Sequence, residues 1–483
     1  MEKQKNLFAF LPLLIVYLCL ESSPAAGQSQ WLDVGFTADA EESGGQFQPL
    51  LSDPTGIFSM GFLRVNSSNL DIAVVHLPSS FPVWRASPSD SAEASSSASL
   101  SFNGSLIFSG IKTGVIWSTP VTAGDRVVLL NSSNLQILKL GETNSVLWQS
   151  FDFPANTIVQ NQNFTSAAAL FSPNQRYSMK LGSDYLALFM EFGRGIEEPM
   201  YWKRTALQSK NLIIAGDGPL YARVETPGFI GLYQKENAPV DVVPFDSFGR
   251  GIPGFRRLTL EDDGNVRGYY WNGTVWDSDY AAITGLCELP SPCGAYGLCN
   301  AETGRCGCLD NRSNGCFPSD SGDLCRSGDE FSVLRSKGVD LGNKEVLSFV
   351  KVGNYVECEQ LCVKNCSCWA AVYNNGSGYC YPVNYPVQTV VAVGDEQKMG
   401  YFKLRSAKND GGGGDKRKRT EKALLIVGVV AAAAVAGVGV YRLRCAGRWR
   451  RRRESLDGAA PGPYKDLNSG SFRSIELVDS FRK

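Results

Sequence analysis

The sequence predicts a mostly-β protein with a single membrane-spanning helix near its C-terminus, and three observations support that prediction. Short apolar runs alternate with Gly, Asn and Ser turns from Trp31 to about Thr165, and the same texture continues through residues 166–283. No 3.6-residue period is sustained there, so antiparallel sheet is favoured over helix. A cysteine-dense region follows, and eighteen uncharged residues at 424–441 then have the length needed to cross a bilayer.

The N-terminus has the pattern of a secretory signal peptide. Lysines precede an apolar core at residues 7–20, and small residues follow up to Gly27. We expect residues 1–27 to be removed by cleavage after Gly27. An uncleaved anchor is the alternative, but the apolar core is short and contains Pro12. Export of the following chain predicts a single-pass type I protein of the plasma membrane with an extracellular N-terminal part.

The membrane helix is predicted at 423–441, after a Gly-rich linker at 406–422. Arginines follow it at once, which is typical of a segment that stops transfer; a buried core helix is the alternative. Small residues spaced four apart in the helix, Gly428 with Ala432 and Ala433 with Gly437, would let two copies approach closely and form a homodimer.

The predicted cytoplasmic tail, residues 442–483, is short and basic, with 11 Lys and Arg against 5 Asp and Glu. Such a cluster attracts anionic lipid, and Cys445 and Ser455 are candidates for acylation and phosphorylation, although an unmodified anchor explains them equally well. The formal net charge of the whole chain is −1, so the remainder is mildly acidic. This balance argues against nucleic-acid binding, which needs clustered Lys and Arg.

Two distributions agree with an extracellular N-terminal part. All the Asn-x-Ser/Thr glycosylation sequons precede the predicted membrane helix, as expected for a glycosylated exterior. They lie at Asn66, Asn103, Asn131, Asn163, Asn272, Asn311, Asn365 and Asn375. Twelve of the 14 cysteines lie between the predicted signal peptide and the helix, an even number that suits oxidised pairing.

The first β region carries a specific resemblance. LWQSFDFPANT at 147–157, with GVIWST at 114–119 and IFSMGF at 57–62, resembles the bulb-type (G-type) mannose-lectin domain of plant S-domain receptor proteins. The resemblance implies a β-prism over residues 31–165, three small sheets around a core that includes Trp117 and Trp148. The polar stretch 88–99 is expected to be a solvated loop.

Mannose-binding relatives use a Gln-x-Asp-x-Asn-x-Val-x-Tyr strand, and two stretches here align with it incompletely. One alignment places Ser101, Asn103, Ser105 and Ser109 at the polar positions, and the other places Leu130, Ser132, Asn134 and Leu138 there. A pocket that lacks these donors and acceptors loses affinity and discrimination, so we expect no mannose binding at either stretch.

A second lectin-like domain is expected at 166–283. RRLTLEDDGNVRGYYW at 256–271 is similar to the phrase that ends the S-locus glycoprotein region of the same receptors, which implies tandem β-prisms. Glu261, Asp263, Asn265 and Tyr269 fall at the spacing of the mannose motif, with Arg267 in place of Val. Asp263, Asn265 and Tyr269 are therefore candidate sugar-binding residues. The alternative is an ordinary strand that follows an Asp-Asp-Gly-Asn turn.

The cysteines at 287–316 resemble the EGF-like module of these receptors. A segment of about thirty residues needs disulfides because it cannot bury enough apolar surface to fold alone. The resemblance implies that Cys287 pairs with Cys299 and Cys293 with Cys306, and Cys308 with Cys316 remains by elimination. Zinc binding is the rival interpretation, but an exported protein favours disulfides.

Residues 325–405 match the PAN/apple module, through the spacing of CEQLCVKNCSCWA at 358–370. Two cysteines four residues apart lie on one face of a helix, so both can fasten it to a sheet. The resemblance implies that Cys358 pairs with Cys380 and Cys362 with Cys368, which leaves Cys325 with Cys366. All six cysteines are expected to be structural.

The sequence predicts no enzyme, no cofactor and no metal site. S-domain relatives usually continue into a Ser/Thr kinase, but the 42 residues after the predicted helix are too few for one and carry none of its signatures. His76, the only histidine, lies in an apolar run and has no partner for nucleophilic catalysis.

The resemblance therefore predicts a kinase-less cell-surface receptor-like glycoprotein. It would bind an extracellular peptide or glycan ligand or a related receptor, and would signal through a partner receptor kinase. The expected partners are that receptor kinase or a second copy of the chain, bound through the ectodomain or the helix. The alternative is a carbohydrate-binding sensor of the wall or of glycans, for which Asn265→Ala should abolish retention on mannose resin.

Overall fold

The computed structural model describes most of the chain before residue 406. The described residues are 29–41, 45–67, 69–87, 92–93, 98–110, 113–120, 123–192, 198–206, 220–235, 238–309, 316, 331–384, 387–405 and 442. The predicted signal peptide and linker lie outside these residues, and so do the predicted membrane helix and, apart from Arg442, the basic tail. Among the described residues no helix is long and apolar enough to cross a membrane.

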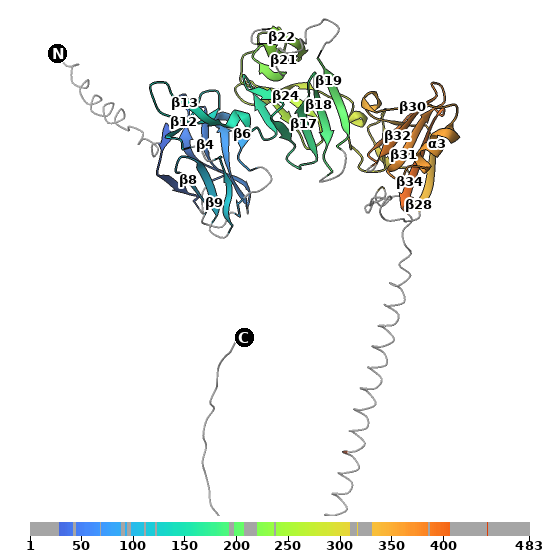
Figure 1. Cartoon of the computed structure of the whole chain (residues 1–483), viewed down its shortest axis with the longest axis horizontal. Helices are drawn as coiled ribbons and strands as arrows, with labels where there is room; N and C mark the ends of the chain where they lie inside the picture. Colours follow the sequence, from blue (N-terminus) through green and yellow to red (C-terminus); the bar gives the residue numbers. More distant parts are fainter. Residues whose placement is uncertain are drawn as a thin grey trace, which may run out of the picture. The chain divides into compact units, whose positions relative to one another are not determined.

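The first β unit, residues 31–149, consists of three antiparallel sheets (Figure 1). One sheet has the order β1 (Trp31–Asp33), β11 (Arg126–Leu129), β12 (Leu135–Lys139) and β13 (Ser145–Gln149). The next has the order β10 (Gly114–Ser118), β9 (Leu106–Gly110), β8 (Ala98–Phe102) and β2 (Phe36–Asp39). The third has β3 (Phe47–Ser52), β4 (Phe58–Asn66), β5 (Asn69–His76) and β6 (Phe81–Arg85), with β7 (Ala92–Glu93) paired to β5.

Alternating side chains from all three sheets of the first β unit meet in one core. Trp148 is 5% exposed within it, and half-buried Trp117 packs against it. The rings of Trp84, Trp117 and Trp148 lie edge to face, with centroids 5.8 to 6.1 Å apart. These tryptophans therefore act as packing residues at the point where the three sheets converge.

The polar stretch at 88–99 is not a loop throughout. Ala92 and Glu93 form β7 by pairing with Leu70 and Asn69, and β8 already begins at Ala98. The prediction of a solvated loop over the whole stretch was wrong at these positions, because backbone pairing with neighbouring strands overrides the low strand propensity of a Ser-rich sequence.

The second β unit, residues 157–281, repeats the arrangement with three four-stranded antiparallel sheets. The first has the order β14 (Thr157–Val159), β23 (Arg256–Leu260), β24 (Val266–Trp271) and β25 (Trp276–Ala281). The second has β15 (Asn163–Thr165), β20 (Tyr221–Glu225), β21 (Phe229–Lys235) and β22 (Ala238–Pro244). The third has β16 (Ala169–Phe171), β17 (Tyr177–Leu181), β18 (Tyr185–Met190) and β19 (Met200–Thr205). One hydrophobic cluster again joins all three sheets.

The cysteine-rich segment and the C-terminal segment share a sheet. Its order is β27 (Cys306–Cys308), β26 (Gly297–Asn300), β33 (Val390–Ala392) and β29 (Val339–Leu341), and β26 pairs with β33 in parallel. The Tyr296 hydroxyl donates to the Lys403 carbonyl at 2.7 Å, and Tyr296 packs against Trp369 and Phe402 in a common core. The cysteine-rich segment is therefore fastened to its neighbour by backbone pairing as well as by packing.

The remaining sheet supports the α-helix described in this part of the chain, α3 (Tyr355–Val363). The sheet has the order β28 (Phe331–Lys337), β34 (Lys398–Arg405), β31 (Cys368–Asn374), β32 (Tyr379–Asn384) and β30 (Val350–Lys351). Asn354 caps α3 by accepting from the Glu357 N–H at 3.0 Å. At the other end, buried Lys403 donates to the carbonyl groups of Cys362 and Asn365 at 2.8 and 3.0 Å.

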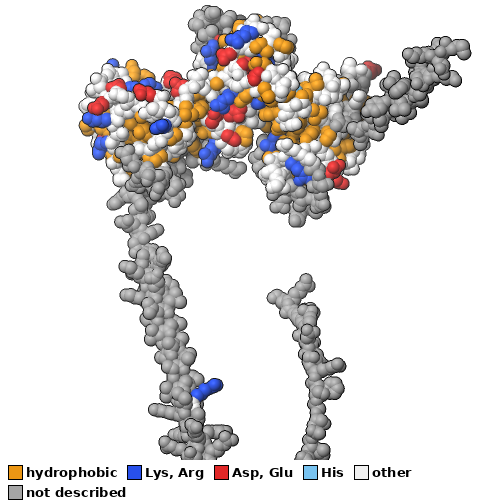
Figure 2. Space-filling view, turned by 180° about the vertical axis from the view of Figure 1, so that it is seen from behind, with side chains coloured by type: hydrophobic (Ala, Val, Ile, Leu, Met, Phe, Trp, Pro, Cys, Tyr) orange, Lys and Arg blue, Asp and Glu red, His pale blue; other side chains and the backbone are white. Residues whose placement is uncertain are grey.

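The described surface carries charges of both signs. In Figure 2, Lys and Arg side chains alternate with Asp and Glu over the visible face, among apolar and uncharged side chains. This mixture agrees with the near-neutral composition and offers no broad basic surface on that face for a polyanion. The mostly-β fold that the sequence predicts is confirmed among the described residues.

Candidate functional site

Asn265, the central residue of the sequence-predicted sugar site, faces the interior. Its side chain is 2% exposed. The Nδ2 group donates to the Ile283 carbonyl at 2.7 Å, and Oδ1 accepts from the Ile283 N–H at 3.0 Å. Both polar ends of the amide thus have backbone partners, so the side chain fastens the segment after β25 to the start of β24.

The neighbouring side chains of this strand bind one another. The Tyr269 hydroxyl donates to Glu261 Oε1 at 2.7 Å, and Arg267 Nη2 lies 2.6 Å from Asp263 Oδ2. Burial, aided by the hydrogen bond to Glu261 and the charge of that carboxylate, raises the pKa of Tyr269 to about 12. Burial also raises the pKa of Asp263, but hydrogen bonds from Arg267 and Asn265 outweigh it and leave that pKa below its usual value.

The two incomplete motif alignments in the first β unit also fall on internal hydrogen bonds. Asn103 Oδ1 accepts from the Ser105 N–H at 3.3 Å, and the Ser105 hydroxyl donates to the Pro120 carbonyl at 3.1 Å. Asn134, 5% exposed, donates to Gln149 Oε1 at 2.9 Å. These polar side chains hold turns and strands together instead of lining an open pocket.

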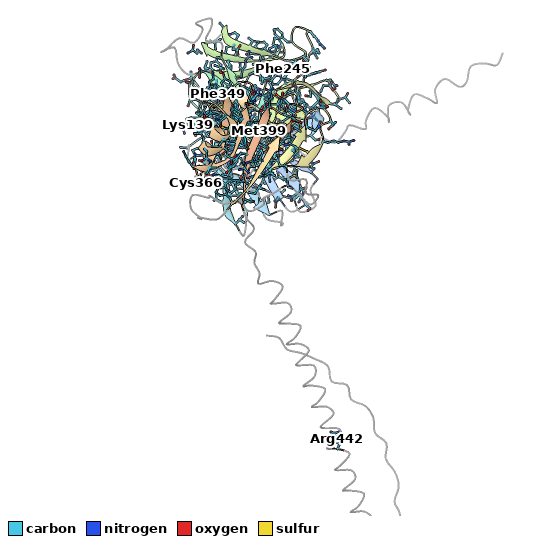
Figure 3. The ribbon with its side chains drawn as sticks, turned by 90° about the vertical axis from the view of Figure 1, so that its right-hand side faces the viewer. Lys139, Phe245, Phe349, Cys366, Met399 and Arg442 are labelled. Carbon is cyan, nitrogen blue, oxygen red and sulfur yellow. A yellow bond between two sulfur atoms is a disulfide. The ribbon has the colours of Figure 1, made fainter. Side chains whose placement is uncertain are left out.

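The disulfides fasten the C-terminal third of the described chain. They join Cys287 to Cys299, Cys293 to Cys306, Cys308 to Cys316, Cys358 to Cys380, and Cys362 to Cys368. The family resemblance implies four of these pairs, and Cys308 with Cys316 is the pair that remains by elimination. Cys366 is also disulfide-bonded, and its expected partner Cys325 lies outside the described residues. Figure 3 views this part of the molecule from the side, with Cys366 and Met399 labelled. Cys358, Cys362, Cys368 and Cys380 are fully buried, which fits a structural role.

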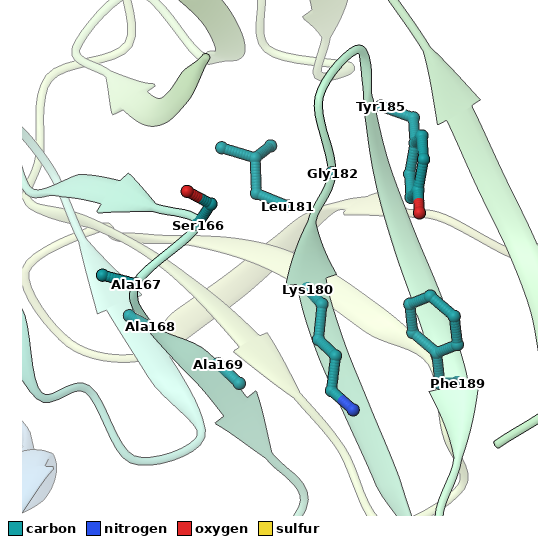
Figure 4. A pocket seen from close by; sticks show the side chains of 9 residues that line it. All are labelled: Ser166, Ala167, Ala168, Ala169, Lys180, Leu181, Gly182, Tyr185 and Phe189. Atoms are coloured by element: carbon teal, nitrogen blue, oxygen red, sulfur yellow. The ribbon is translucent and has the colours of Figure 1, made fainter. Parts of the chain in front are cut away.

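The described residues contain no cluster of three or more His, Cys, Asp or Glu side chains arranged to hold a metal ion. They do contain a hollow on the outer face of the sheet β16–β17–β18–β19, which we call the β17 hollow, with a volume of about 360 Å³ (Figure 4). It is lined by Ser166, Ala167, Ala168, Ala169, Lys180, Leu181, Gly182, Tyr185 and Phe189.

Strand alternation explains how the β17 hollow forms. Leu186, Leu188 and Met190 of β18 point into the core, so Tyr185 and Phe189 lie on the opposite face. In Figure 4 these two rings form one wall, Lys180 projects between the walls, and the alanines at 167–169 lie on the other side. Small side chains on one side and large rings on the other leave the space between them open.

Gly182 sets the position of Tyr185. A Cβ atom at Gly182 would lie 2.4 Å from the Tyr185 ring, so the ring packs directly on the glycine backbone. From the neighbouring strand β19, Lys203 Nζ lies 4.4 Å from the centroid of the Tyr185 ring. The ring is therefore fixed on two sides and remains only half-buried.

The charges beside the β17 hollow balance. Lys180 Nζ lies 3.1 Å from Glu191 Oε1 and also contacts Glu198. Burial lowers the pKa of Lys180, but hydrogen bonds to Glu198 and Glu191 outweigh it and raise that pKa above its ordinary value. With Lys203 as a second cation, two positive and two negative side chains surround the aromatic wall. The lining of the hollow thus offers aromatic faces, the Ser166 hydroxyl and the Lys180 ammonium group, and the carboxylates that pair with Lys180 balance its charge.

Sequence reasoning did not identify the β17 hollow. From the sequence, residues 166–283 show only the alternating texture of β-strands. The available signal was a Tyr and a Phe four residues apart on one strand, with a glycine just before the Tyr and three alanines upstream. That pattern is common in ordinary sheets, so it indicates the β17 hollow only when the packing of Gly182 against Tyr185 is known.

Comparisons with known protein families show which domains the chain contains. A model of the D-mannose binding lectin family matches residues 82–178, and a PAN domain model matches residues 325–405. The lectin match runs from β6 of the first β unit into β17 of the second. The chain therefore combines lectin and PAN domains, as its resemblance to S-domain receptor proteins indicated.

Comparisons with individual proteins show which family the chain belongs to. The chain is 45% identical over 450 residues to a PAN domain-containing protein of Arabidopsis thaliana, and the match covers 92% of this chain and 91% of the relative. The chain belongs to the family of that PAN domain-containing protein. It is also 27% identical over 381 residues to a G-type lectin S-receptor-like serine/threonine-protein kinase of Arabidopsis thaliana, covering 74% of this chain but 42% of the kinase. The chain thus spans less than half of that kinase.

A solved structure, the two-domain fetuin-binding agglutinin of Scilla campanulata, is 16% identical to this chain. It covers 49% of this chain and 95% of the lectin, with a TM-score of 0.19.

Proposed function

We propose that this protein is a receptor-like cell-surface glycoprotein that binds an uncharged glycan in the β17 hollow. The observation that supports the proposal most strongly is the half-buried Tyr185 ring, fixed by Gly182 and Lys203 beside an open volume of about 360 Å³. Carbohydrate rings present apolar C–H faces that pack on aromatic rings, and their hydroxyl groups need nearby donors and acceptors. The hollow offers both kinds of group.

The balanced charge of the hollow supports an uncharged ligand. An anionic sugar would have to compete with Glu191 and Glu198 for Lys180, and a cationic ligand would meet the ammonium groups of Lys180 and Lys203. A neutral sugar can hydrogen-bond to the ion pair without separating it, and so avoids the penalty of leaving a half-buried charge alone.

The sequence-predicted site at Asp263, Asn265 and Tyr269 remains a second candidate for sugar binding. Its side chains would first have to release their partners, whereas the β17 hollow is already open. The lectin family match also ends within β17, close to the residues that line the hollow.

We also propose the domain organisation predicted from the sequence. It comprises a signal peptide at 1–27, tandem β-prism domains at 31–165 and 166–283, an EGF-like module at 287–316, a PAN domain at 325–405 and a membrane helix at 423–441. The three sheets of each β unit support the β-prism assignment. The side chains of the seven described sequon asparagines are all exposed, which supports glycosylation and an extracellular location; Asn311 lies outside the described residues.

We further propose that the protein signals through a partner receptor kinase. It is supported by the relationship to S-receptor-like kinases, which combine a G-type lectin with a kinase by name. Co-purification of the tagged full-length protein, compared with a version truncated after Arg444, tests this part. Recovery of a receptor kinase with both versions supports binding of that kinase by residues that precede the tail. Recovery of no kinase contradicts this part of the proposal.

Glycan binding is tested with the detergent-solubilised full-length protein on an array of neutral and acidic glycans. Tyr185→Ala and Phe189→Ala should each lower binding to neutral glycans at least tenfold, because each removes one ring of the wall. Phe248→Ala is the matched control, since Phe248 is an aromatic residue of the second β unit that is 48% exposed and outside the hollow. Retained binding in both hollow variants, with unchanged thermal stability, would rule out the β17 hollow.

A further inference from the structure

An aromatic cluster joins the first β unit to the second, and we call it the aromatic junction. Phe58, His76 and Phe81 come from the first unit, and Phe255, Trp271 and Trp276 come from the second. The Phe58 and Phe255 rings meet edge to face at 5.0 Å, and Phe81 meets Trp276 at 5.9 Å. These distances lie in the range of favourable aromatic pairs, so the junction holds the two units together without a covalent link beyond the chain itself.

His76 occupies the centre of the aromatic junction. Its ring stacks on Phe255 at 6.0 Å with an interplanar angle of 17°, and it meets Trp271 and Trp276 at 5.3 and 5.4 Å. The residue is 2% exposed. Its Nδ1 atom hydrogen-bonds to the Ser79 hydroxyl at 2.7 Å. A titratable ring therefore lies at an apolar contact between the two β units.

A buried positive charge borders the aromatic junction. The Arg257 guanidinium carbon lies 3.9 Å from the Phe81 ring centroid and 4.8 Å from that of Trp276, two of the rings in the cluster. Arg257 is 6% exposed, and its Nε has no hydrogen-bond partner among the described residues. Burial lowers the pKa of Arg257 to about 10, so it remains charged at neutral pH. A proton on His76 would place a second cation in the same desolvated region.

The carboxylates on the strands around the junction are engaged elsewhere. On β5 and β6, Asp71 pairs with Arg85 at 2.8 Å. On β23 and β25, Arg256 pairs with Asp279 at 2.8 Å, and Asp277 accepts from Asn272 at 2.8 Å.

The other ionisable groups near the junction are also paired. On β24, Arg267 pairs with Asp263, and the Tyr269 hydroxyl, beside Arg257, donates to Glu261. Before β4, the Asp53 carboxylate accepts from the Phe58 N–H at 2.7 Å. These partners leave the carboxylates poorly placed to neutralise a protonated His76.

We propose that the aromatic junction is a pH-sensitive latch, in which protonation of His76 weakens the contact between the two β units while each unit keeps its own core. The inference is independent of glycan binding, because it concerns the sheet β14–β23–β24–β25 and not the β17 hollow. In the closed latch the units behave as one body, and in the open latch Phe255, Trp271 and Trp276 become accessible to water.

The direction of the pH effect follows from burial. Burial lowers the pKa of His76 from 6.5 to about 4 in the closed state, whereas an exposed imidazole keeps the ordinary value. The open state therefore binds more protons between these two values, and the contact weakens as the pH falls from 6.5 towards 4. From these values the equilibrium should shift towards the open state by about 20-fold between pH 7 and pH 5.

Hydrogen exchange on the full-length protein in detergent tests the latch. Protection factors, which correct for the intrinsic pH dependence of exchange, are compared at pH 7 and pH 5 for amides in β23, β24 and β4 that border the junction. Wild type should lose protection at these amides by about 20-fold. Amides in the separate cores, around Met179 and Ile137, should keep theirs.

Two variants make the test specific. His76→Phe preserves a stacking ring but cannot bind a proton, so its junction amides should show the same protection at both pH values. Ser79→Ala removes the hydrogen bond to Nδ1 but keeps the titratable ring, so it should retain the pH response. An equal loss of protection in wild type and His76→Phe, or a loss that spreads through both cores, would overturn the proposal.

Discussion

The predicted sugar strand at 261–269 and the β17 hollow lie in the same β unit and are built from similar residues, yet only the hollow is open. On the predicted strand, Tyr269 is hydrogen-bonded to Glu261, and Asn265 is held by the Ile283 backbone. In the hollow, Tyr185 packs on a glycine and leaves space beside it. The comparison teaches that a binding site needs open space beside its aromatic and polar groups, which residue spacing alone does not reveal.

The largest expected effect is a loss of stability from a substitution in the predicted sugar strand at 261–269. Asn265→Ala should lower the free energy of unfolding by about 3 kcal/mol, because it leaves the N–H and carbonyl of Ile283 buried without partners. Urea denaturation measures this loss. Asn144→Ala, at an exposed turn, should change stability by less than about 0.5 kcal/mol. Unchanged stability combined with lost glycan binding would instead place the sugar at Asn265.

A smaller effect, on glycan affinity, is expected from a substitution at the β17 hollow. Gly182→Ala places a Cβ atom against the Tyr185 ring and should displace it, lowering glycan affinity about tenfold, or about 1.4 kcal/mol. Titration calorimetry with the best glycan from the array measures the affinity. Gly394→Ala is the control, since a Cβ atom there meets nothing within 4 Å. Equal affinity for Gly182→Ala and wild type would show that the position of Tyr185 does not matter for binding.

The smallest effect is expected at the ion pair between Asp263 and Arg267 of the predicted sugar strand. Asp263→Asn should cost less than about 1 kcal/mol at pH 7, because its side chain and that of Arg267 are 38% and 28% exposed. The pKa of Asp263 is lowered in the folded state, so its contribution is present above pH 3.8 and is lost as the pH falls through the lowered value. Unfolding curves of wild type and variant should therefore converge in acid, and a constant difference down to pH 2 would contradict this explanation.

Much of the fold could be predicted from particular residues. The LWQSFDFPANT phrase and the cysteine spacing indicate the lectin and PAN domains, and strand alternation places Trp148 in a core. The joining of the cysteine-rich segment to the PAN segment could not be predicted. It depends on parallel pairing between β26 and β33, which are about ninety residues apart and too short to carry a distinctive pattern.

The candidate site was less predictable than the fold. The amide of Asn265 has the same donors and acceptors whether it meets a sugar or the Ile283 backbone, and the sequence does not say which lies closer. Likewise, the sequence shows only that His76 lies in an apolar run, and its contact with Trp271 and Trp276 arises only when the second β unit packs against the first.

The sequence by itself determined the β-rich character, the lectin and PAN membership and the cysteine spacing between residues 287 and 380, because periodicity and spacing are local properties of the chain. The tertiary structure alone decided which polar side chains are satisfied internally, where an open hollow remains, and which rings surround His76. Those features depend on distances between strands that are remote in sequence, and a difference of a few ångströms decides whether a polar group binds its own backbone or a ligand.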